Sequence, residues 1–226
     1  MGKTQALRDG IDAVLAVALG ASCAACGELL EHPTRGPVCP VCWRVIAAMA
    51  PPVFEIAGAI DRAQAVGPYE GALRSIIHSL KYEGRRSLAR PLAAFMRDRC
   101  PSILDGADIV VPVPLHPSRR RERGFNQARD LARGLGLPVV GAIRRIRATE
   151  SQIGLPAPQR QRNMRNAFAA SRVPWRTRAI GGSVAVLVDD VSTTGSTLED
   201  CARVLHEMGA REVRAITAAR ALMSPR

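Results

Sequence analysis

Apolar residues follow two patterns along the chain, which predict two kinds of secondary structure. Unbroken apolar runs at 109–114, 183–188 and 212–218 predict buried strands, and a further strand is expected within 139–146. Apolar residues spaced three or four positions apart predict helices, and such stretches lie at 5–19, 71–80, 87–99, 124–136 and 196–208. Because strands alternate with helices, we expect an α/β fold with a mostly parallel sheet flanked by helices.

The length and the cysteines indicate a main domain preceded by a small module. The chain has 226 residues, more than one average domain and fewer than two. Residues 23–42 contain four cysteines among several Pro and Gly residues, and Pro51 and Pro52 follow. We therefore expect an N-terminal helix and metal-binding module in residues 1–50 and the α/β domain in residues 51–226.

Two acids, Asp189 and Asp190, follow the apolar run at 183–188, and a turn rich in Ser, Thr and Gly leads into the next helix. Ligands bind at the carboxyl ends of parallel strands, and the amino end of a helix attracts anions. This layout suits a sugar phosphate, with the acids accepting hydrogen bonds from vicinal hydroxyls. The turn would hold the phosphate through Ser192, Thr193, Thr194, Gly195, Ser196 and Thr197. The alternative, an ordinary helix cap at a sheet edge, does not explain two adjacent acids.

The segment 186–198 resembles the 5-phosphoribosyl 1-pyrophosphate motif of type I phosphoribosyltransferases, an apolar run, two acids and then T-T-G-x-T. The resemblance implies the type I phosphoribosyltransferase fold. It also implies that Asp189 and Asp190 are the catalytic acids and contact the ribose hydroxyls, while the turn holds the 5′-phosphate. A bound Mg²⁺ is expected with the donor, because a hard, oxygen-seeking cation neutralises pyrophosphate.

A basic segment at 118–123 follows the strand at 109–114, and we interpret it as a loop. Its guanidinium groups suit pyrophosphate oxygens, which arginine binds in bidentate fashion, although a solvated basic loop is the alternative. His116 stands beside this segment. We interpret it as structural or solvated, because the departure of pyrophosphate depends mainly on positioning and electrostatics.

The basic segment, the sequence 80–84 (L-K-Y-x-G), the stretch 147–168 and the cysteine module together look like the ComF family. Its members are phosphoribosyltransferase-like proteins linked to competence for DNA uptake. The resemblance implies that 115–124 is the pyrophosphate loop and that 147–166, which has no clear period, is a flexible loop that closes over the ligand. It adds Lys81, Arg119 and Arg123 to the expected donor-binding residues.

The cysteines form two pairs, Cys23-x-x-Cys26 and Cys39-x-x-Cys42. Each pair can place two thiolates on one knuckle, and two knuckles complete a tetrahedral Zn²⁺ site with no open position, which is structural rather than catalytic. Two disulfides are the alternative, and they are disfavoured in a cytoplasmic protein. We expect Cys100 and Cys201 to be small core residues.

The net charge of +12 favours anionic partners, although a codon bias towards arginine would give the same total. No apolar stretch approaches the roughly 18 residues of a membrane-spanning helix, so we expect no stable membrane insertion. The apolar stretch 11–19 loosely imitates an export signal, but it contains Asp12 and lacks a convincing cleavage site. We therefore expect a cytoplasmic protein.

Two functions are compatible with these features. The first is a phosphoribosyltransferase-fold protein that binds 5-phosphoribosyl 1-pyrophosphate and acts in DNA uptake and handling, with single-stranded DNA and a DNA-uptake helicase or other competence proteins as partners. The second is an active phosphoribosyltransferase with an unidentified metabolic acceptor and no nucleic-acid role. The sequence favours the first and leaves turnover open, since it shows no acceptor-base signature. It also contains no GxxxxGK[ST] loop, so the chain is not an ATP-driven motor.

Overall fold

The computed structural model describes residues 11, 12, 14, 15, 20–52, 54, 56, 58–146 and 167–221 of the chain. Of the helix expected at 5–19, the described residues Ile11, Asp12, Val14 and Leu15 are helical. The loop expected at 147–166 lies outside the described residues.

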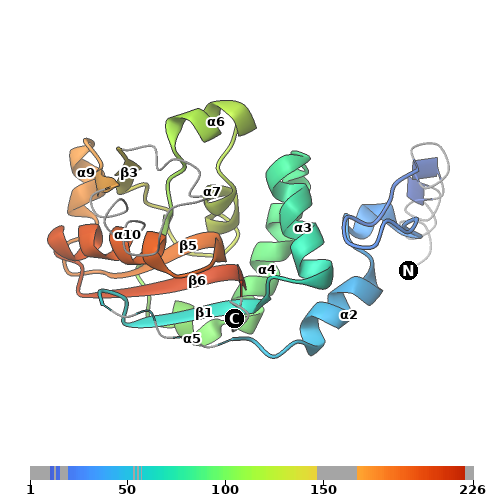
Figure 1. The fold of residues 1–226 in the computed structure, drawn as a ribbon, viewed down its shortest axis with the longest axis horizontal. Helices are drawn as coiled ribbons and strands as arrows, with labels where there is room; N and C mark the ends of the chain where they lie inside the picture. The colour runs from blue at the N-terminus through green and yellow to red at the C-terminus, as the bar shows by residue number, and fades with distance from the viewer. Residues whose placement is uncertain are drawn as a thin grey trace, which may run out of the picture.

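A four-stranded parallel sheet forms the centre of the fold, in the order β1-β6-β5-β2 (Figure 1). The strands are β1 (Arg62–Pro68), β2 (Ile109–Pro112), β5 (Val184–Ser192) and β6 (Glu212–Arg220). The mostly parallel sheet and three of its strands are therefore confirmed. The sequence did not reveal β1, because this edge strand contains Arg62, Gln64 and Gly67 and only one β-branched residue, Val66.

A separate antiparallel pair lies beside the main sheet. It consists of β3 (Ile143–Arg145) and β4 (Phe168–Ala170). The strand expected within 139–146 is therefore present but short, and its first residue, Val139, forms only an isolated bridge to Val110.

Helices cover both faces of the sheet, as the unbroken burial of residues 184–188 in β5 requires. Val186 and Val188 belong to one apolar core, while Ala185 and Leu187 belong to the other. The first core packs against α3 (Gly71–Tyr82), the turn η2 (Arg86–Leu88), α4 (Ala89–Arg99), α5 (Pro101–Leu104) and α7 (Gln127–Ala132). The second packs against α10 (Ser196–Glu207), β3 and β4, with α9 (Pro174–Arg178) nearby (Figure 1).

The basic segment expected as a loop is a helix, α6 (Pro117–Arg123), so that prediction was wrong. Pro117 stands in the first turn, where its missing N–H costs nothing, and the His116 ring nitrogen accepts from the Ser118 amide at 3.3 Å. Gly124 ends the helix in the left-handed region at φ 73°. These local signals form a helix although it buries no side chain.

The expected cap of the following helix is confirmed. Asn126 Oδ1 accepts from the Arg129 amide at 3.4 Å, while its Nδ2 donates to the Val113 carbonyl at 3.0 Å. One side chain thus starts α7 and ties it to the segment that follows β2.

The cysteine module comprises a short turn, η1 (Pro33–Arg35), and the helix α2 (Pro40–Ala48), and it lies beyond α3 from the sheet (Figure 1). Leu30 and Ile46 are buried in the same core as Leu73 of α3, and the Trp43 ring lies 5.2 Å from that of Phe95. Cys100 and Cys201 are fully buried, as expected of core residues. Within the described part of the chain, no helix is both long and apolar enough to cross a membrane.

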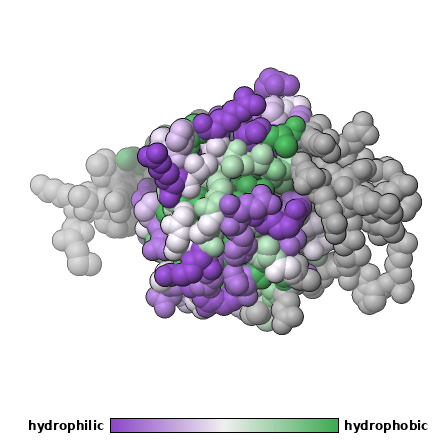
Figure 2. Space-filling model, turned by 90° about the vertical axis from the view of Figure 1, so that its left-hand side faces the viewer, coloured by the Kyte–Doolittle hydropathy of each residue, from purple (hydrophilic) through white to green (hydrophobic). Residues whose placement is uncertain are grey.

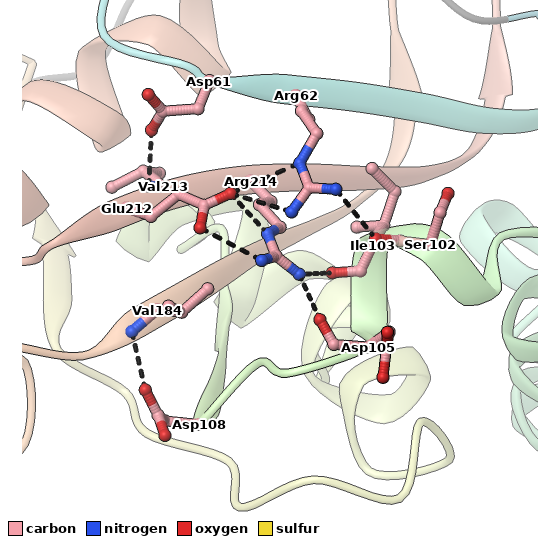
Figure 3. Close-up of polar contacts among 10 residues, drawn as sticks. All are labelled: Asp61, Arg62, Ser102, Ile103, Asp105, Asp108, Val184, Glu212, Val213 and Arg214. Atoms are coloured by element: carbon pink, nitrogen blue, oxygen red, sulfur yellow. Dashed lines mark hydrogen bonds and ion pairs between the residues drawn. The ribbon is translucent and has the colours of Figure 1, made fainter.

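A network of polar contacts closes the amino end of the sheet (Figure 3). The buried Arg214 donates to the Glu212 carboxylate at 2.7 and 3.0 Å and to the carbonyl groups of Ile103 and Asp105. These bonds satisfy a guanidinium group that would otherwise be costly to bury. The Arg214 guanidinium lowers the pKa of Glu212 to about 2. The polar groups labelled at this end of the sheet are thus engaged in structural pairing.

Candidate functional site

The strand β5 continues through both acids to Ser192 instead of ending at residue 188. Because side chains alternate along a strand, Asp190 lies on the face covered by α3 and α7, and Asp189 lies on the face covered by α10. The contacts agree, since Asp190 bonds to Lys81 and Gln127, whereas Asp189 acts electrostatically on Cys201 of α10. The two adjacent acids therefore have different surroundings.

The protein itself engages both oxygens of Asp190. Lys81 Nζ lies 2.8 Å from Oδ1, and Gln127 Nε2 donates to Oδ2 at 2.9 Å. Burial alone would lower the pKa of Lys81, but attraction to Asp190 outweighs it and raises that pKa. Gln127 is buried, and its Oε1 has no hydrogen-bond partner among the described residues. Asp190 is thus a carboxylate held in one orientation by two neighbouring helices.

Asp189 is the more accessible acid. Its Oδ1 accepts from the Asp190 amide at 2.9 Å, and no ion pair engages it among the described residues. Burial and repulsion by Asp190 raise the pKa of Asp189 to about 7, and attraction to Lys81 offsets this only in part. A carboxyl group poised near neutral pH can accept a hydrogen bond from a hydroxyl, and it would ionise more readily beside a cation.

The turn after β5 exposes Thr193 and Thr194 and leads into α10. Thr194 Oγ1 lies 2.8 Å from Ser196 Oγ, so the two hydroxyls share one edge of the turn. Gly195 has a left-handed φ of 82°, and an added Cβ would lie 3.0 Å from Ile56. As the N-cap it contributes no side chain, so the positive end of the α10 dipole faces the turn.

The arginines of α6 lie near those of β3. Burial and repulsion by Arg119 lower the pKa of Arg145, while Asp189 acts in the opposite direction. The Arg123 guanidinium carbon lies 5.0 Å from the centre of the Tyr82 ring. Arg120 and Arg121 of α6 line one cavity with Arg144 and Arg145 of β3, so the arginines of the two elements converge. The stretch 147–166 contains further arginines, all outside the described residues: Arg147, Arg160, Arg162 and Arg165.

The four module cysteines meet in one cluster, with every Sγ within 4.8 Å of the others. The distances Cys23–Cys42 and Cys26–Cys39 are both 3.9 Å, too long for the S–S bond of about 2.05 Å. A tetrahedral ion with Zn–S distances of about 2.3 Å requires about 3.8 Å between sulfurs, so the cluster could hold a metal.

Backbone amides support thiolates in this cluster. The amides of Ala25 and Cys39 donate to Cys23 Sγ at 3.4 and 3.3 Å, and the Cys42 amide donates to Cys39 Sγ at 3.5 Å. Burial opposes ionisation of Cys23, but the backbone amides of Cys26, Cys39 and Ala25 outweigh it and lower the pKa of this thiol to about 6, whereas the pKa values of Cys26 and Cys42 are raised. The deprotonated form is the one that binds metal.

Sequence reasoning missed two residues of the site. Gln127 follows the cap residue of α7 and ends a segment that resembles the ComF family, but the sequence indicated no role for it. Ile56 packs against Gly195, although the two residues are 139 positions apart in the sequence (195 − 56). Only the packing of distant segments brings either residue to the site.

The comparisons with known proteins agree with this architecture. Residues 121–224 match the family model of the phosphoribosyl transferase domain. Competence protein F of Haemophilus influenzae is 35% identical over 173 residues, which are 71% of this chain and 73% of that protein. DNA utilization protein YhgH of Salmonella typhimurium is 34% identical over 202 residues, 85% of this chain and 81% of that protein.

Among solved structures, one described as the allosteric regulatory enzyme of purine biosynthesis is 19% identical with a TM-score of 0.40. The match covers 63% of this chain and 30% of the solved chain.

The domain match and the parallel sheet with helices on both faces put the chain among the phosphoribosyltransferase-type α/β proteins. The identity to Competence protein F and to YhgH over most of each protein's length is more specific. The chain belongs to the ComF family.

Proposed function

We propose that the carboxyl edge of the sheet binds 5-phosphoribosyl 1-pyrophosphate with Mg²⁺, and that the protein acts in DNA uptake and handling during natural competence. One observation carries the binding proposal: Asp189 and Asp190 lie in the last part of β5, which runs to Ser192, and a Ser/Thr/Gly turn leads from there to the amino end of α10. The competence role is supported by the names of the relatives, a competence protein and a DNA utilization protein.

The residues would divide the donor between them. The turn from Ser192 to Thr197 would hold the 5′-phosphate through hydroxyls and the positive end of the helix dipole. Asp189, whose carboxylate is the more accessible, would accept a ribose hydroxyl, with Asp190 oriented beside it. Lys81 belongs to this site through its ion pair with Asp190. Arg119 and Arg123 of α6 would interact with the pyrophosphate.

Carboxylates and phosphate oxygens are the ligands that Mg²⁺ prefers, so the acids and the donor's pyrophosphate fit this ion. Bound there, Mg²⁺ would neutralise charge on the leaving pyrophosphate. The protein's own groups would orient the ribose, and Lys81 would limit repulsion between the acids and the anionic donor.

The test is to incubate the full-length protein with donor and Mg²⁺ and to measure both donor binding and pyrophosphate release, with and without candidate acceptors. Binding is expected in the presence of Mg²⁺. If pyrophosphate is released only when one acceptor is added, the second candidate, an active phosphoribosyltransferase, gains support. Absence of binding at millimolar donor with Mg²⁺ would contradict the proposal.

Single-stranded DNA is the proposed macromolecular partner, and the α6 and β3 arginines are its proposed contacts. Each phosphate contact releases counterions, so log K should fall with log salt at a slope of about −0.7 per contact. Anisotropy of a labelled oligonucleotide at several salt concentrations measures this slope. Binding that is absent even at low salt would leave the metabolite site without a DNA role.

We also propose that residues 1–50 form a zinc-stabilised module on a phosphoribosyltransferase-like domain of residues 51–226, working in the cytoplasm. The four-thiol geometry supports zinc, since four sulfurs without an open position make a structural site. A reduced cluster also suits the reducing conditions of that compartment. Zinc modules often contact nucleic acid or partner proteins, and a DNA-uptake helicase or another competence protein is the proposed protein partner.

A further inference from the structure

A cavity of about 560 Å³ lies between α6, α7, β3 and α9, and arginines dominate its wall. No Asp or Glu is among its described lining residues. Figure 2 views the end of the molecule that carries α9 and β3, and hydrophilic residues gather at the top, at the level of α6 in Figure 1. The cavity arginines are Arg120, Arg121, Arg129, Arg144, Arg145 and Arg176.

Most arginines of this cavity differ from other described arginines in their lack of a carboxylate partner. Among the described residues, seven other arginines form ion pairs, namely Arg62, Arg85, Arg86, Arg97, Arg133, Arg203 and Arg214. Within the described residues, Arg120, Arg121, Arg129, Arg144 and Arg176 form no ion pair with a carboxylate, and the buried Nε of Arg176 has no partner. Like charges in one cavity repel each other, and a bound anion would relieve this repulsion.

Some of these side chains are held in place. Arg144 Nε donates to the Ala170 carbonyl at 3.0 Å, and the Arg176 guanidinium carbon lies 5.2 Å from the centre of the Trp175 ring. Arg176 Nη1 lies 3.7 Å from the position that a Cβ on Gly141 would take. Guanidinium groups anchored at their bases are already oriented, so binding an anion costs less side-chain entropy.

The cavity shares α6 with the proposed donor site, but Arg119 and Arg123, the α6 residues assigned to the pyrophosphate, are not among its lining residues. Neither Asp189, Asp190 nor the turn 192–197 is among its lining residues. The two sites adjoin because Pro112 of the cavity pairs in register with Val188, the residue before Asp189. A second anion could therefore bind here while the donor occupies the acids and the turn.

We propose that this cavity binds the terminal phosphate of a nucleotide, either a free nucleoside 5′-phosphate or the 5′-phosphorylated end of a single strand. A phosphomonoester carries −1.5 to −2 charges and three acceptor oxygens on one centre, which matches several guanidinium groups around one space. A diester linkage inside a strand carries one charge. Leu115, Ile143 and Pro114 give the wall an apolar part against which a base can pack. The volume lies within the roughly 300–1,000 Å³ of small-molecule sites.

The first test compares 5′-phosphorylated with 5′-hydroxyl oligothymidylate by anisotropy, and dTMP with thymidine by calorimetry, using the full-length protein. The phosphorylated ligand of each pair is expected to bind about tenfold or more tightly than the unphosphorylated one. Preference for the phosphorylated strand alone would assign the site to strand ends, and preference for dTMP alone would assign it to free nucleotides. Equal affinities within both pairs would overturn the proposal.

The second test uses Arg144→Gln with Arg176→Gln, and Arg97→Gln on the exposed face of α4 as a control that removes charge elsewhere. The double variant should lose the preference for the 5′-phosphate, whereas Arg97→Gln should keep it. Arg144→Lys retains the charge but not the planar guanidinium group that binds phosphate in bidentate fashion. It should weaken the preference for the 5′-phosphate without affecting folding. Donor affinity should stay the same in the double variant. If donor affinity falls in parallel with the nucleotide preference, the cavity is part of the donor site and the separate site is refuted.

Discussion

Lys81 and Asp190 form an ion pair of 2.8 Å between side chains that are only 15% and 8% exposed. It joins α3 to the end of β5, and Gln127 of α7 completes the arrangement from a second helix. The pair fixes one of the two acids and leaves the other accessible. The two adjacent acids of the site are therefore not equivalent.

Lys81→Met should destabilise the protein by about 3 kcal/mol at neutral pH, because removing one member of a buried pair leaves an uncompensated charge. Adding Asp190→Asn to Lys81→Met should restore part of the loss, since the remaining group is then neutral. Urea unfolding of wild type and of both variants measures the effect. A loss below about 0.5 kcal/mol for Lys81→Met would show that the pair is not needed for stability.

Asp189→Asn should make the folded state more stable at pH 8 and have no effect near pH 4. The folded pKa of about 7 lies above the ordinary value of 3.8, so the folded carboxyl group holds its proton more tightly than the unfolded one. Wild-type stability therefore falls as pH rises from about 4 to about 7, and the amide variant avoids this loss, on the order of 4 kcal/mol. Free energies of unfolding between pH 4 and pH 8 test this, with the exposed Asp98→Asn as control. A difference that is the same at all pH values would contradict the raised pKa.

The purified protein should contain one zinc ion per chain, and Cys39→Ser should release it and unfold the N-terminal module. Cys100→Ala is the matched control, because Cys100 is a buried cysteine outside the cluster and its replacement should leave the metal in place. Elemental analysis and circular dichroism measure both effects. Protein that contains no metal, or thiol titration that reveals two disulfides, would show that the cluster is not a metal site.

Local sequence signals predicted the parts of the fold that depend on neighbouring residues. The apolar run before Asp189 predicted a central strand, and Asn126 correctly marked the start of α7. The strand β1 was missed because edge strands need fewer β-branched residues. The helix α6 was missed because a run of arginines without apolar spacing looks like a solvated loop, and its ends are set by His116, Pro117 and Gly124.

For the site, the sequence predicted the acids and the turn as one unit, because these residues are contiguous. It could not show that Asp190 forms an ion pair with Lys81 and accepts a hydrogen bond from Gln127, because packing must bring three elements together to form these contacts. The same holds for the arginine cavity. Arg176 and Arg121 are 55 positions apart in the sequence (176 − 121), and only the fold brings both to the lining of one cavity.

The most direct test of the central claim is the calorimetric affinity of the full-length protein for 5-phosphoribosyl 1-pyrophosphate with Mg²⁺, in wild type and in Asp189→Asn. This acid is chosen because its replacement leaves the Lys81–Asp190 pair intact, and Asp98→Asn is the control. Loss of one charge-assisted hydrogen bond should weaken binding by about 1.5–3 kcal/mol, roughly ten- to a hundredfold. Unchanged affinity in a correctly folded Asp189→Asn protein, or no binding by wild type, would contradict the account.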